Sequence, residues 1–179
     1  MHEFEKHPEA GEILGQAVWE IPTDIREINK YEEELGQMLT KFRWDEEANY
    51  FVRLAFSESL VNAIVHANLG LEKASLEDYE KQILEAQNTI EAKNKKVLVN
   101  AEVTSEKILI TIQDMGGEKG KDMFAKKFLA EDPRTKENIL KTSGRGGILM
   151  QHAFGPDGVH YELNDLGTKL ILEKQKETN

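Results

Sequence analysis

The chain has 179 residues, of which 39% are hydrophobic and 31% charged, and its formal net charge is −10. This composition predicts one soluble domain with a substantial core, and the negative charge argues against a general nucleic-acid binder, whose affinity depends on neutralising phosphates. Because there is no cysteine and no run of the roughly 20 apolar residues that a membrane-spanning helix needs, disulfides, thiol catalysis, cysteine-bound zinc and a transmembrane helix are excluded. Without an apolar signal segment near the start of the chain, the expected location is the cytoplasm.

The first elements in chain order are a tail, a strand and a helix. Residues 1–12 are polar and lack periodicity, which is typical of a flexible terminus. A strand is predicted over residues 13–21. Thr23 and Asp24 can cap a helix that runs to about residue 42.

A second and more apolar helix is expected to follow. Asp45 can cap it, and it runs over about residues 46–68, with Gly70 as the residue that ends it. The next segment, 71–95, is rich in Glu, Lys and Gln and predicts a solvent-exposed helix with one narrow apolar seam. This seam either packs on its own domain or forms a dimer or partner contact. The seam consists of Leu76, Tyr79, Ile83, Gln87 and Ile90.

The second half of the chain predicts mainly strands. Two runs, separated by Ser105 and Glu106, pair as an antiparallel hairpin, and a charged segment follows. A glycine-rich turn then opens a short apolar helix, and two strands close the chain. The predicted fold class is therefore α/β (α+β), a two-layer sandwich of a mostly antiparallel sheet with helices on one face. The hairpin strands are expected over 96–103 and 107–113, and the charged segment over 118–142. The apolar helix is expected over 144–154 and the last two strands over 159–163 and 168–172.

The charge is distributed unevenly along the sequence. Between residues 118 and 145, eight basic residues outnumber five acidic ones, whereas the chain as a whole is acidic. A locally positive segment of this kind suits a small anionic ligand. A solvated loop of mixed charge would have the same composition, so both interpretations stay open.

Three polar residues of the second predicted helix lie four positions apart. Glu58, Asn62 and His66 would form one polar stripe at the margin of an apolar face. A carboxylate, a carboxamide and an imidazole in that position are costly to bury unless they have partners. Either local side chains satisfy them, or they hold a ligand.

Two glycine-containing turns carry further candidate chemistry. Gly144, Arg145 and Gly146 precede an apolar helix, where exposed backbone N–H groups and the positive end of the helix dipole favour phosphate. Asp114 ends a predicted strand and is followed by Gly116, so its carboxylate could accept a hydrogen bond from an amino group such as that of adenine.

In this order, Glu58-x-x-x-Asn62, Asp114-x-Gly116, Ser143-Gly144-Arg145-Gly146 and Gly167-Thr168 resemble the histidine-kinase-like ATPase (GHKL, Bergerat-fold) superfamily. The run from Glu137 to Gly146 is most similar to the anti-sigma-factor serine/threonine kinases of bacterial partner-switching systems. The resemblance covers residues 13–174 as one domain, with 71–95 as an inserted helical segment and 118–142 as an ATP lid.

The resemblance implies a role for each matched residue. Asn62 would coordinate the Mg²⁺ that bridges the phosphates of ATP, and Glu58 would be the general base toward a serine of a partner protein. Asp114 would bind adenine, supported by Gly116 and Thr168. The remaining expected contacts are Gly144, Arg145 and Gly146 along the triphosphate, and His66 and Asn68 at the border of the site.

Three functions are weighed. The first is a Mg-ATP-dependent serine kinase and anti-sigma factor that binds a sigma factor, phosphorylates an anti-sigma antagonist and forms a homodimer. The second is a nucleotide-binding regulatory module without phosphotransfer, which Glu118 favours because it stands where the family motif has a second glycine. A fragment of a sensor histidine kinase is the third and fits least, since His66 lies inside the nucleotide helix and is a poor phosphoacceptor.

Overall fold

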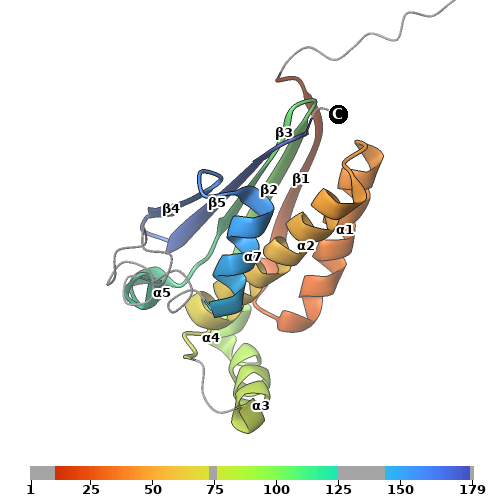
Figure 1. Ribbon diagram of the computed structural model, residues 1–179. Helices are drawn as coiled ribbons and strands as arrows, with labels where there is room; N and C mark the ends of the chain where they lie inside the picture. The colour runs from red at the N-terminus through yellow and green to blue at the C-terminus, as the bar shows by residue number, and fades with distance from the viewer. Residues whose placement is uncertain (1–10, 73–75, 125–143, 178–179) are drawn as a thin grey trace, which may run out of the picture.

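The computed structural model describes residues 11–72, 76–124 and 144–177. Five antiparallel strands form one sheet in the order β1-β2-β3-β5-β4, and the helices α1, α2 and α7 cover one face of it (Figure 1). The predicted two-layer α+β fold class is therefore confirmed. The strands are β1 Ile13–Pro22, β2 Lys96–Thr104, β3 Lys107–Gln113, β4 Val159–Leu163 and β5 Thr168–Gln175.

The predicted hairpin forms the middle of the sheet. Alternate valine and isoleucine side chains of β2 and β3 are buried, while the residues between them are half-buried or exposed. This alternation is expected of strands that pack one face on a core. The Thr104 hydroxyl fixes the turn by accepting hydrogen bonds from the N–H groups of Glu106 and Lys107, at 3.2 and 3.0 Å.

The first helical segment begins with a short 3₁₀ turn, η1 (Ile25–Glu27), and continues as α1 (Ile28–Lys41). Asp24 caps η1 by accepting from the Arg26 N–H. Asp45 caps α2 (Glu46–Val61) by accepting from the Ala48 N–H at 2.8 Å. Both capping residues were predicted, and both are confirmed.

The second helix does not stay α-helical to its end. Residues Asn62–Asn68 form η2, a π-helix, in which each backbone N–H reaches one residue further back and the turn is wider. The Leu69 N–H donates to the Ile64 carbonyl at 2.9 Å, which closes this wide turn. Gly70 follows with a φ of +65°, so it ends the helix as predicted. π-Helical turns are frequent at functional sites.

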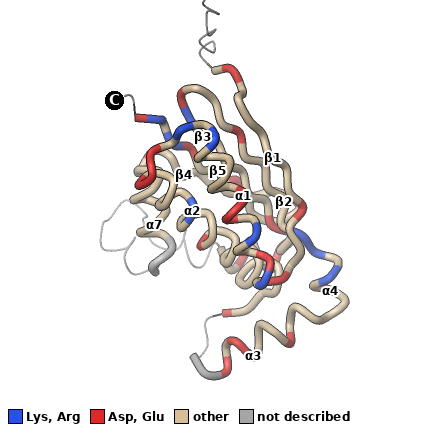
Figure 2. The backbone as a smooth tube through the Cα atoms, turned by 90° about the vertical axis from the view of Figure 1, so that its right-hand side faces the viewer, with Lys and Arg blue, Asp and Glu red and all other residues tan. Residues whose placement is uncertain are grey.

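The 71–95 segment contains two helices rather than one. They are α3 (Leu76–Gln87) and α4 (Ile90–Lys93), and Thr89 caps α4 by accepting from the Ala92 N–H. Of the predicted seam, Ile83 and Gln87 are buried against the rest of the chain, so this part of the seam packs on its own domain. Figure 2 shows acidic residues along α3.

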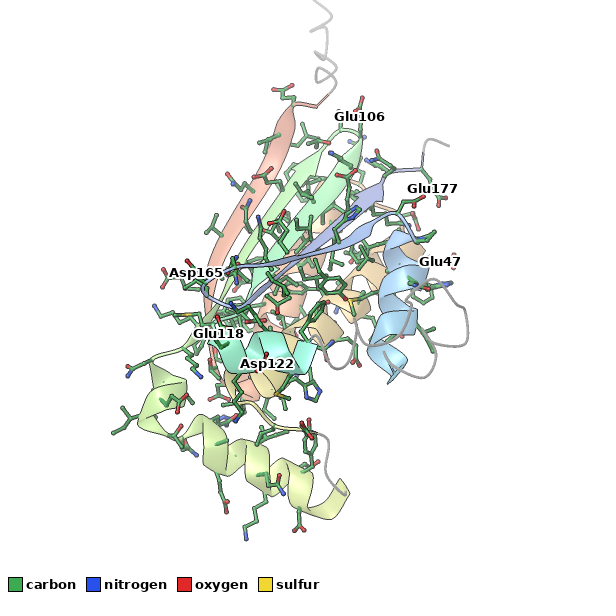
Figure 3. The ribbon with its side chains drawn as sticks, turned by 90° about the vertical axis from the view of Figure 1, so that its left-hand side faces the viewer. Glu47, Glu106, Glu118, Asp122, Asp165 and Glu177 are labelled. Carbon is green, nitrogen blue, oxygen red and sulfur yellow. The ribbon has the colours of Figure 1, made fainter. Side chains whose placement is uncertain are left out.

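Part of the charged segment is helical, which the sequence did not predict. Helix α5 (Gly117–Phe124) lies between the end of the sheet and α3 (Figure 3). It packs on η2, because a Cβ atom on Gly120 would lie 3.6 Å from Ala67. The rest of the predicted lid, up to residue 142, lies outside the described residues, and α7 (Gly144–Phe154) follows.

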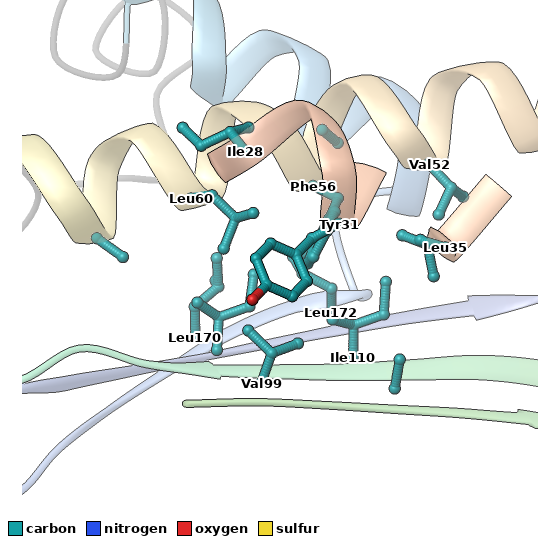
Figure 4. Packing of buried hydrophobic residues seen from close by; sticks show 14 of the residues in the cluster. Ile28, Tyr31, Leu35, Val52, Phe56, Leu60, Val99, Ile110, Leu170 and Leu172 are labelled. Carbon is teal, nitrogen blue, oxygen red and sulfur yellow. The ribbon is translucent and has the colours of Figure 1, made fainter. Parts of the chain in front are cut away.

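The core fills the space between the sheet and its helical layer. Phe56 of α2 is fully buried at its centre, and the Trp19 ring of β1 contacts both the Tyr31 and the Phe56 ring, with centroids 5.9 and 6.0 Å apart. Side chains of α1 and α2 point at those of β2, β3 and β5 (Figure 4). Among the described residues, no helix has the length and apolarity that crossing a membrane requires.

Candidate functional site

Glu58 and Asn62 lie near the C-terminal end of α2 and are half-buried. The helix is α-helical through Val61, and Asn62 keeps α-helical dihedral angles of −60° and −45°, so the two side chains project from the same side. Neither side chain forms a hydrogen bond or an ion pair with any described residue. The alternative in which local side chains satisfy them thus finds no support in the part of the chain that the structure describes.

His66 belongs to η2, the π-helical continuation of α2. Between Asn62 and His66 the helix has the wider π turn, so the angular spacing differs from the α-helical one that the sequence analysis assumed. Its Nδ1 lies 2.7 Å from the Leu71 carbonyl oxygen. The predicted stripe is therefore α-helical only between Glu58 and Asn62, and a place for His66 beside the ligand stays a prediction.

Asp114 directly follows β3 and is 5% exposed. One carboxylate oxygen, Oδ1, accepts two backbone hydrogen bonds, from Gly116 N–H at 3.0 Å and from Thr168 N–H at 3.1 Å. Among the described residues nothing donates to the other oxygen, Oδ2. Burial raises the pKa of Asp114, whereas the two N–H donors and the nearby Lys95 ammonium lower it.

The Gly167-Thr168 pair, 54 residues from Asp114 along the chain, lies directly against it. Gly167 has a φ of +151°, and a Cβ atom there would come within 2.1 Å of Asp114 Oδ1. The Thr168 hydroxyl is buried and has no hydrogen-bond partner among the described residues. A buried hydroxyl without a partner is costly, and a bound polar ligand beside Asp114 would give it one.

Gly116 brings the Asp114 turn close to η2. A Cβ atom at position 116 would lie 2.8 Å from the Ala67 carbonyl oxygen, so only glycine fits there without movement. The Gly117 N–H donates to the Leu166 carbonyl at 2.8 Å. Three segments thus meet at Asp114: the end of β3, the start of β5 and the π-helix that follows Asn62.

Helix α7 runs antiparallel to α2, beside which Figure 1 places it. Ser59 Oγ lies 3.4 Å from Met150 Sδ, and the Phe51 and His152 rings are 4.3 Å apart. Moving toward its N-terminus, α7 therefore approaches the Asn62 end of α2. Its first turn contains Gly144, Arg145 and Gly146, whose side chains lie outside the described residues.

Comparison with known proteins gives the family. The model of the histidine kinase-like ATPase domain matches residues 21–174, which is most of the chain and includes Glu58, Asn62, Asp114 and the Gly167-Thr168 pair. The chain belongs to the histidine kinase-like ATPase domain family. Domains of this family bind ATP, usually with Mg²⁺. No curated protein matches the chain.

The residues present fit a histidine kinase-like ATPase site. Asp114 offers an acceptor and Thr168 an unpartnered hydroxyl, while glycines 116 and 167 leave no side chain between them. No three acidic, histidine or cysteine side chains gather among the described residues into a metal site. Mg²⁺ usually keeps several waters and binds through few protein ligands plus substrate phosphates, so one amide oxygen from Asn62 suits it.

Asn68 lies elsewhere than the sequence analysis expected, and Lys95 is a participant to which the sequence analysis gave no role. Asn68 was expected at the border of the ligand, yet it is 3% exposed and its side chain binds backbone and side-chain groups of the protein. The Lys95 Nζ donates to the Asn68 carbonyl oxygen at 3.0 Å. The one sequence signal for this role is an Asn at the end of the helical segment that contains Asn62, and that signal is weak.

Replacing Gly167 with alanine is expected to destabilise the protein by about 3 kcal/mol and to abolish nucleotide binding. The new Cβ would collide with Asp114 Oδ1, in a backbone conformation that L residues rarely adopt. Thermal unfolding and calorimetric titration with Mg-ATP measure the two effects.

The matched control for Gly167→Ala is Gly155→Ala. Gly155 has a φ of +76°, but a Cβ atom there would meet nothing within 4 Å, so only the backbone cost of about 1 to 2 kcal/mol remains. Equal losses of stability in the two variants would show that the contact with Asp114 carries no cost of its own.

Proposed function

We propose that this protein is an ATP- and Mg²⁺-dependent serine/threonine kinase that also acts as an anti-sigma factor. The observation that carries the proposal is the pair Glu58 and Asn62, which are half-buried and without a partner among the described residues. They lie on the helix that leads into the Asp114 pocket. A nucleotide pocket alone would not need an unpaired carboxylate beside it.

The binding half of the site would use Asp114, Thr168 and Asn62. The Oδ2 atom of Asp114 would accept a hydrogen bond from the adenine amino group, and the Thr168 hydroxyl would bind a ring nitrogen beside it. The Asn62 amide oxygen would be the protein ligand of Mg²⁺, which when bound neutralises part of the phosphate charge. Gly144, Arg145 and Gly146 would lie along the triphosphate, where the N-terminus of α7 favours anions.

The transfer half would use Glu58. Its carboxylate would take the proton from a serine hydroxyl of a partner protein as that oxygen bonds to the γ-phosphorus and ADP leaves. Phosphoryl transfer depends mainly on positioning and charge neutralisation, so few side chains are needed. One carboxylate and one amide on a rigid helix are sufficient for this chemistry.

The partners would be a sigma factor and an anti-sigma antagonist. This part rests on the resemblance of the Glu137–Gly146 run to kinases of bacterial partner-switching systems. Phosphorylation of the antagonist would add charge to its binding surface, so that the modified form no longer binds. A homodimer and a cytoplasmic location belong to the same proposal.

Calorimetric titration with Mg-ATP and Mg-ADP is the first test, followed by incubation of the full chain with labelled ATP and a candidate antagonist. We expect both nucleotides to bind and label to appear on a serine or threonine of the antagonist. If neither nucleotide binds, the proposed function is wrong.

The second candidate is a nucleotide-binding regulatory module without phosphotransfer. It is favoured by Glu118, which stands in the first turn of α5 at the position where the family motif has a glycine. In that case both nucleotides bind, but no label is transferred to any antagonist that the protein captures.

A further inference from the structure

Asn68 is the last residue of the π-helix, and its side chain is almost completely buried. Its Oδ1 accepts a hydrogen bond from the Met115 N–H at 2.7 Å. Its Nδ2 donates to the Thr23 hydroxyl at 3.0 Å and to the Lys96 carbonyl oxygen at 3.1 Å. Both N–H groups of the carboxamide are thus used within the protein, so no donor is left for a ligand.

Three of these groups form a closed ring. Asn68 donates to the Lys96 carbonyl, the Lys96 N–H donates to Met115 Sδ at 3.3 Å, and the Met115 N–H donates back to Asn68. Met115 is the residue between Asp114 and Gly116. The backbone of the Asp114 turn is therefore fastened to the end of the π-helix on one side and to the start of β2 on the other.

The ring is anchored from outside by two further contacts. The Thr23 hydroxyl donates to the Lys95 carbonyl oxygen at 2.8 Å, and the Lys95 ammonium donates to the Asn68 carbonyl oxygen at 3.0 Å. Since Thr23 lies in the turn before η1, the ring connects the N-terminal turn, the π-helix, β2 and the Asp114 turn. Removing Asn68 would leave the Met115 N–H, a partly buried donor, without its partner.

We propose that Asn68 is a positioning residue of the nucleotide site, which fixes the Asp114 carboxylate at a set distance from Asn62. The inference rests on the proposed function, because it assigns Asp114 to adenine and Asn62 to the phosphate end. Both ends of the π-helix then have a role: Asn62 at its start faces the ligand, and Asn68 at its end holds the base-recognition turn. A site that distinguishes one base from another by hydrogen bonds needs its donors and acceptors held in fixed positions. An acceptor that can move would also accommodate the wrong base.

The test compares Mg-ATP with Mg-ITP, in which a carbonyl oxygen replaces the exocyclic amino group of adenine. The wild-type chain should prefer ATP, because Asp114 accepts from the amino group and would face an acceptor in ITP. In Asn68→Ala the ATP-to-ITP affinity ratio should fall about fivefold or more. The readout is selective, since partial unfolding would weaken both nucleotides equally and leave their ratio unchanged.

Asn49→Ala is the matched control. Asn49 also donates two hydrogen bonds, to the Gly36 carbonyl and the Thr40 hydroxyl, but it lies in the first turn of α2, at the opposite end from Asn62. Its loss should lower stability and leave the affinity ratio within about twofold. Thr23→Val removes the hydroxyl that accepts from Asn68 Nδ2 and donates to the Lys95 carbonyl oxygen but leaves the bonds of Asn68 to Met115 and Lys96. It should give a smaller fall in the ratio, and it serves if Asn68→Ala does not fold.

Hydrogen exchange of the Met115 amide in the nucleotide-free protein gives an independent readout, and it should be faster in the Asn68 and Thr23 variants than in Asn49→Ala. A preserved ATP-to-ITP ratio and preserved Met115 protection in both variants would overturn the positioning role alone. Absence of any nucleotide binding by the wild-type chain would instead overturn the proposed function, and the positioning role with it.

Discussion

Replacing Asp114 with asparagine is expected to weaken Mg-ATP binding strongly while leaving the folded protein at least as stable as the wild type. Asparagine has the same shape, and its Oδ1 can still accept from the Gly116 and Thr168 N–H groups. Its Nδ2, however, places a donor where Asp114 has an acceptor, so the adenine amino group would meet another donor. A loss of about 10- to 100-fold in affinity follows, measurable by calorimetric titration.

The difference in stability between Asp114→Asn and the wild type should depend on pH, in a direction that the burial of Asp114 determines. Because burial raises the pKa of Asp114 in the folded state, the unfolded chain loses its proton first as the pH rises. The contribution of Asp114 to stability is therefore full below its ordinary pKa of 3.8 and is lost as the pH rises through the higher folded value. Asparagine has no such dependence, so the variant should gain relative to the wild type between acidic and neutral pH.

Thermal unfolding at pH 4 and pH 7 measures this difference. Asp157→Asn, which changes an exposed aspartate in the turn between α7 and β4, controls for the loss of one negative charge. A variant that is less stable than the wild type at pH 7 would mean that the ionised carboxylate contributes more through its two backbone hydrogen bonds than its burial costs. Stability kept at the expense of binding would mark Asp114 as a site residue rather than a structural one.

The parts of the fold that could be predicted are those with a local cause. Asp45 and Gly70 bound the second helical segment as expected, because capping and a positive φ depend on a few neighbouring residues. Periodicity of two in β2 and β3 likewise predicted the hairpin. The π-helix was missed because the contacts at its end are tertiary. The Asn68 side chain forms hydrogen bonds with Met115, Lys96 and Thr23, none of which is near it in sequence.

Helix α5 was missed for a related reason. Gly117 and Gly120 lower its intrinsic helix propensity, and the sequence around them reads as a charged loop. Gly120 is what lets α5 approach Ala67 closely, so the residue that argues against a helix in isolation permits the packing that forms it. Packing on η2 outweighs the propensity here.

The candidate site, like the fold, could be predicted only in part from the sequence. Position along the chain and residue type were enough to select Asp114 and Thr168, but only through a resemblance, since 54 residues separate them. The geometry that makes Asp114 a usable acceptor was not predictable. It depends on Gly167 approaching one carboxylate oxygen while nothing among the described residues donates to the other.

Replacing Glu58 with glutamine is expected to lower the phosphotransfer rate by about 10²- to 10⁴-fold while leaving Mg-ATP affinity within about twofold. Glutamine keeps the size of the side chain but cannot take a proton from a serine hydroxyl. Since Glu58 contacts no described residue through a hydrogen bond or ion pair, its substitution should not disturb the fold. Label transfer to an antagonist and calorimetric titration measure the two quantities.

Glu47→Gln provides the control, because Glu47 lies exposed in the first turn of the same helix and far from Asn62. The opposite pattern is expected of Asn62→Ala, in which Mg-ATP binding itself weakens and the dependence on Mg²⁺ shifts to higher concentration. If Glu58→Gln transfers label at the wild-type rate, Glu58 is not the base, and its unpaired carboxylate must serve another purpose. If Glu58→Gln instead loses nucleotide binding together with transfer, Glu58 acts in binding the nucleotide rather than as the base alone, because transfer requires bound ATP.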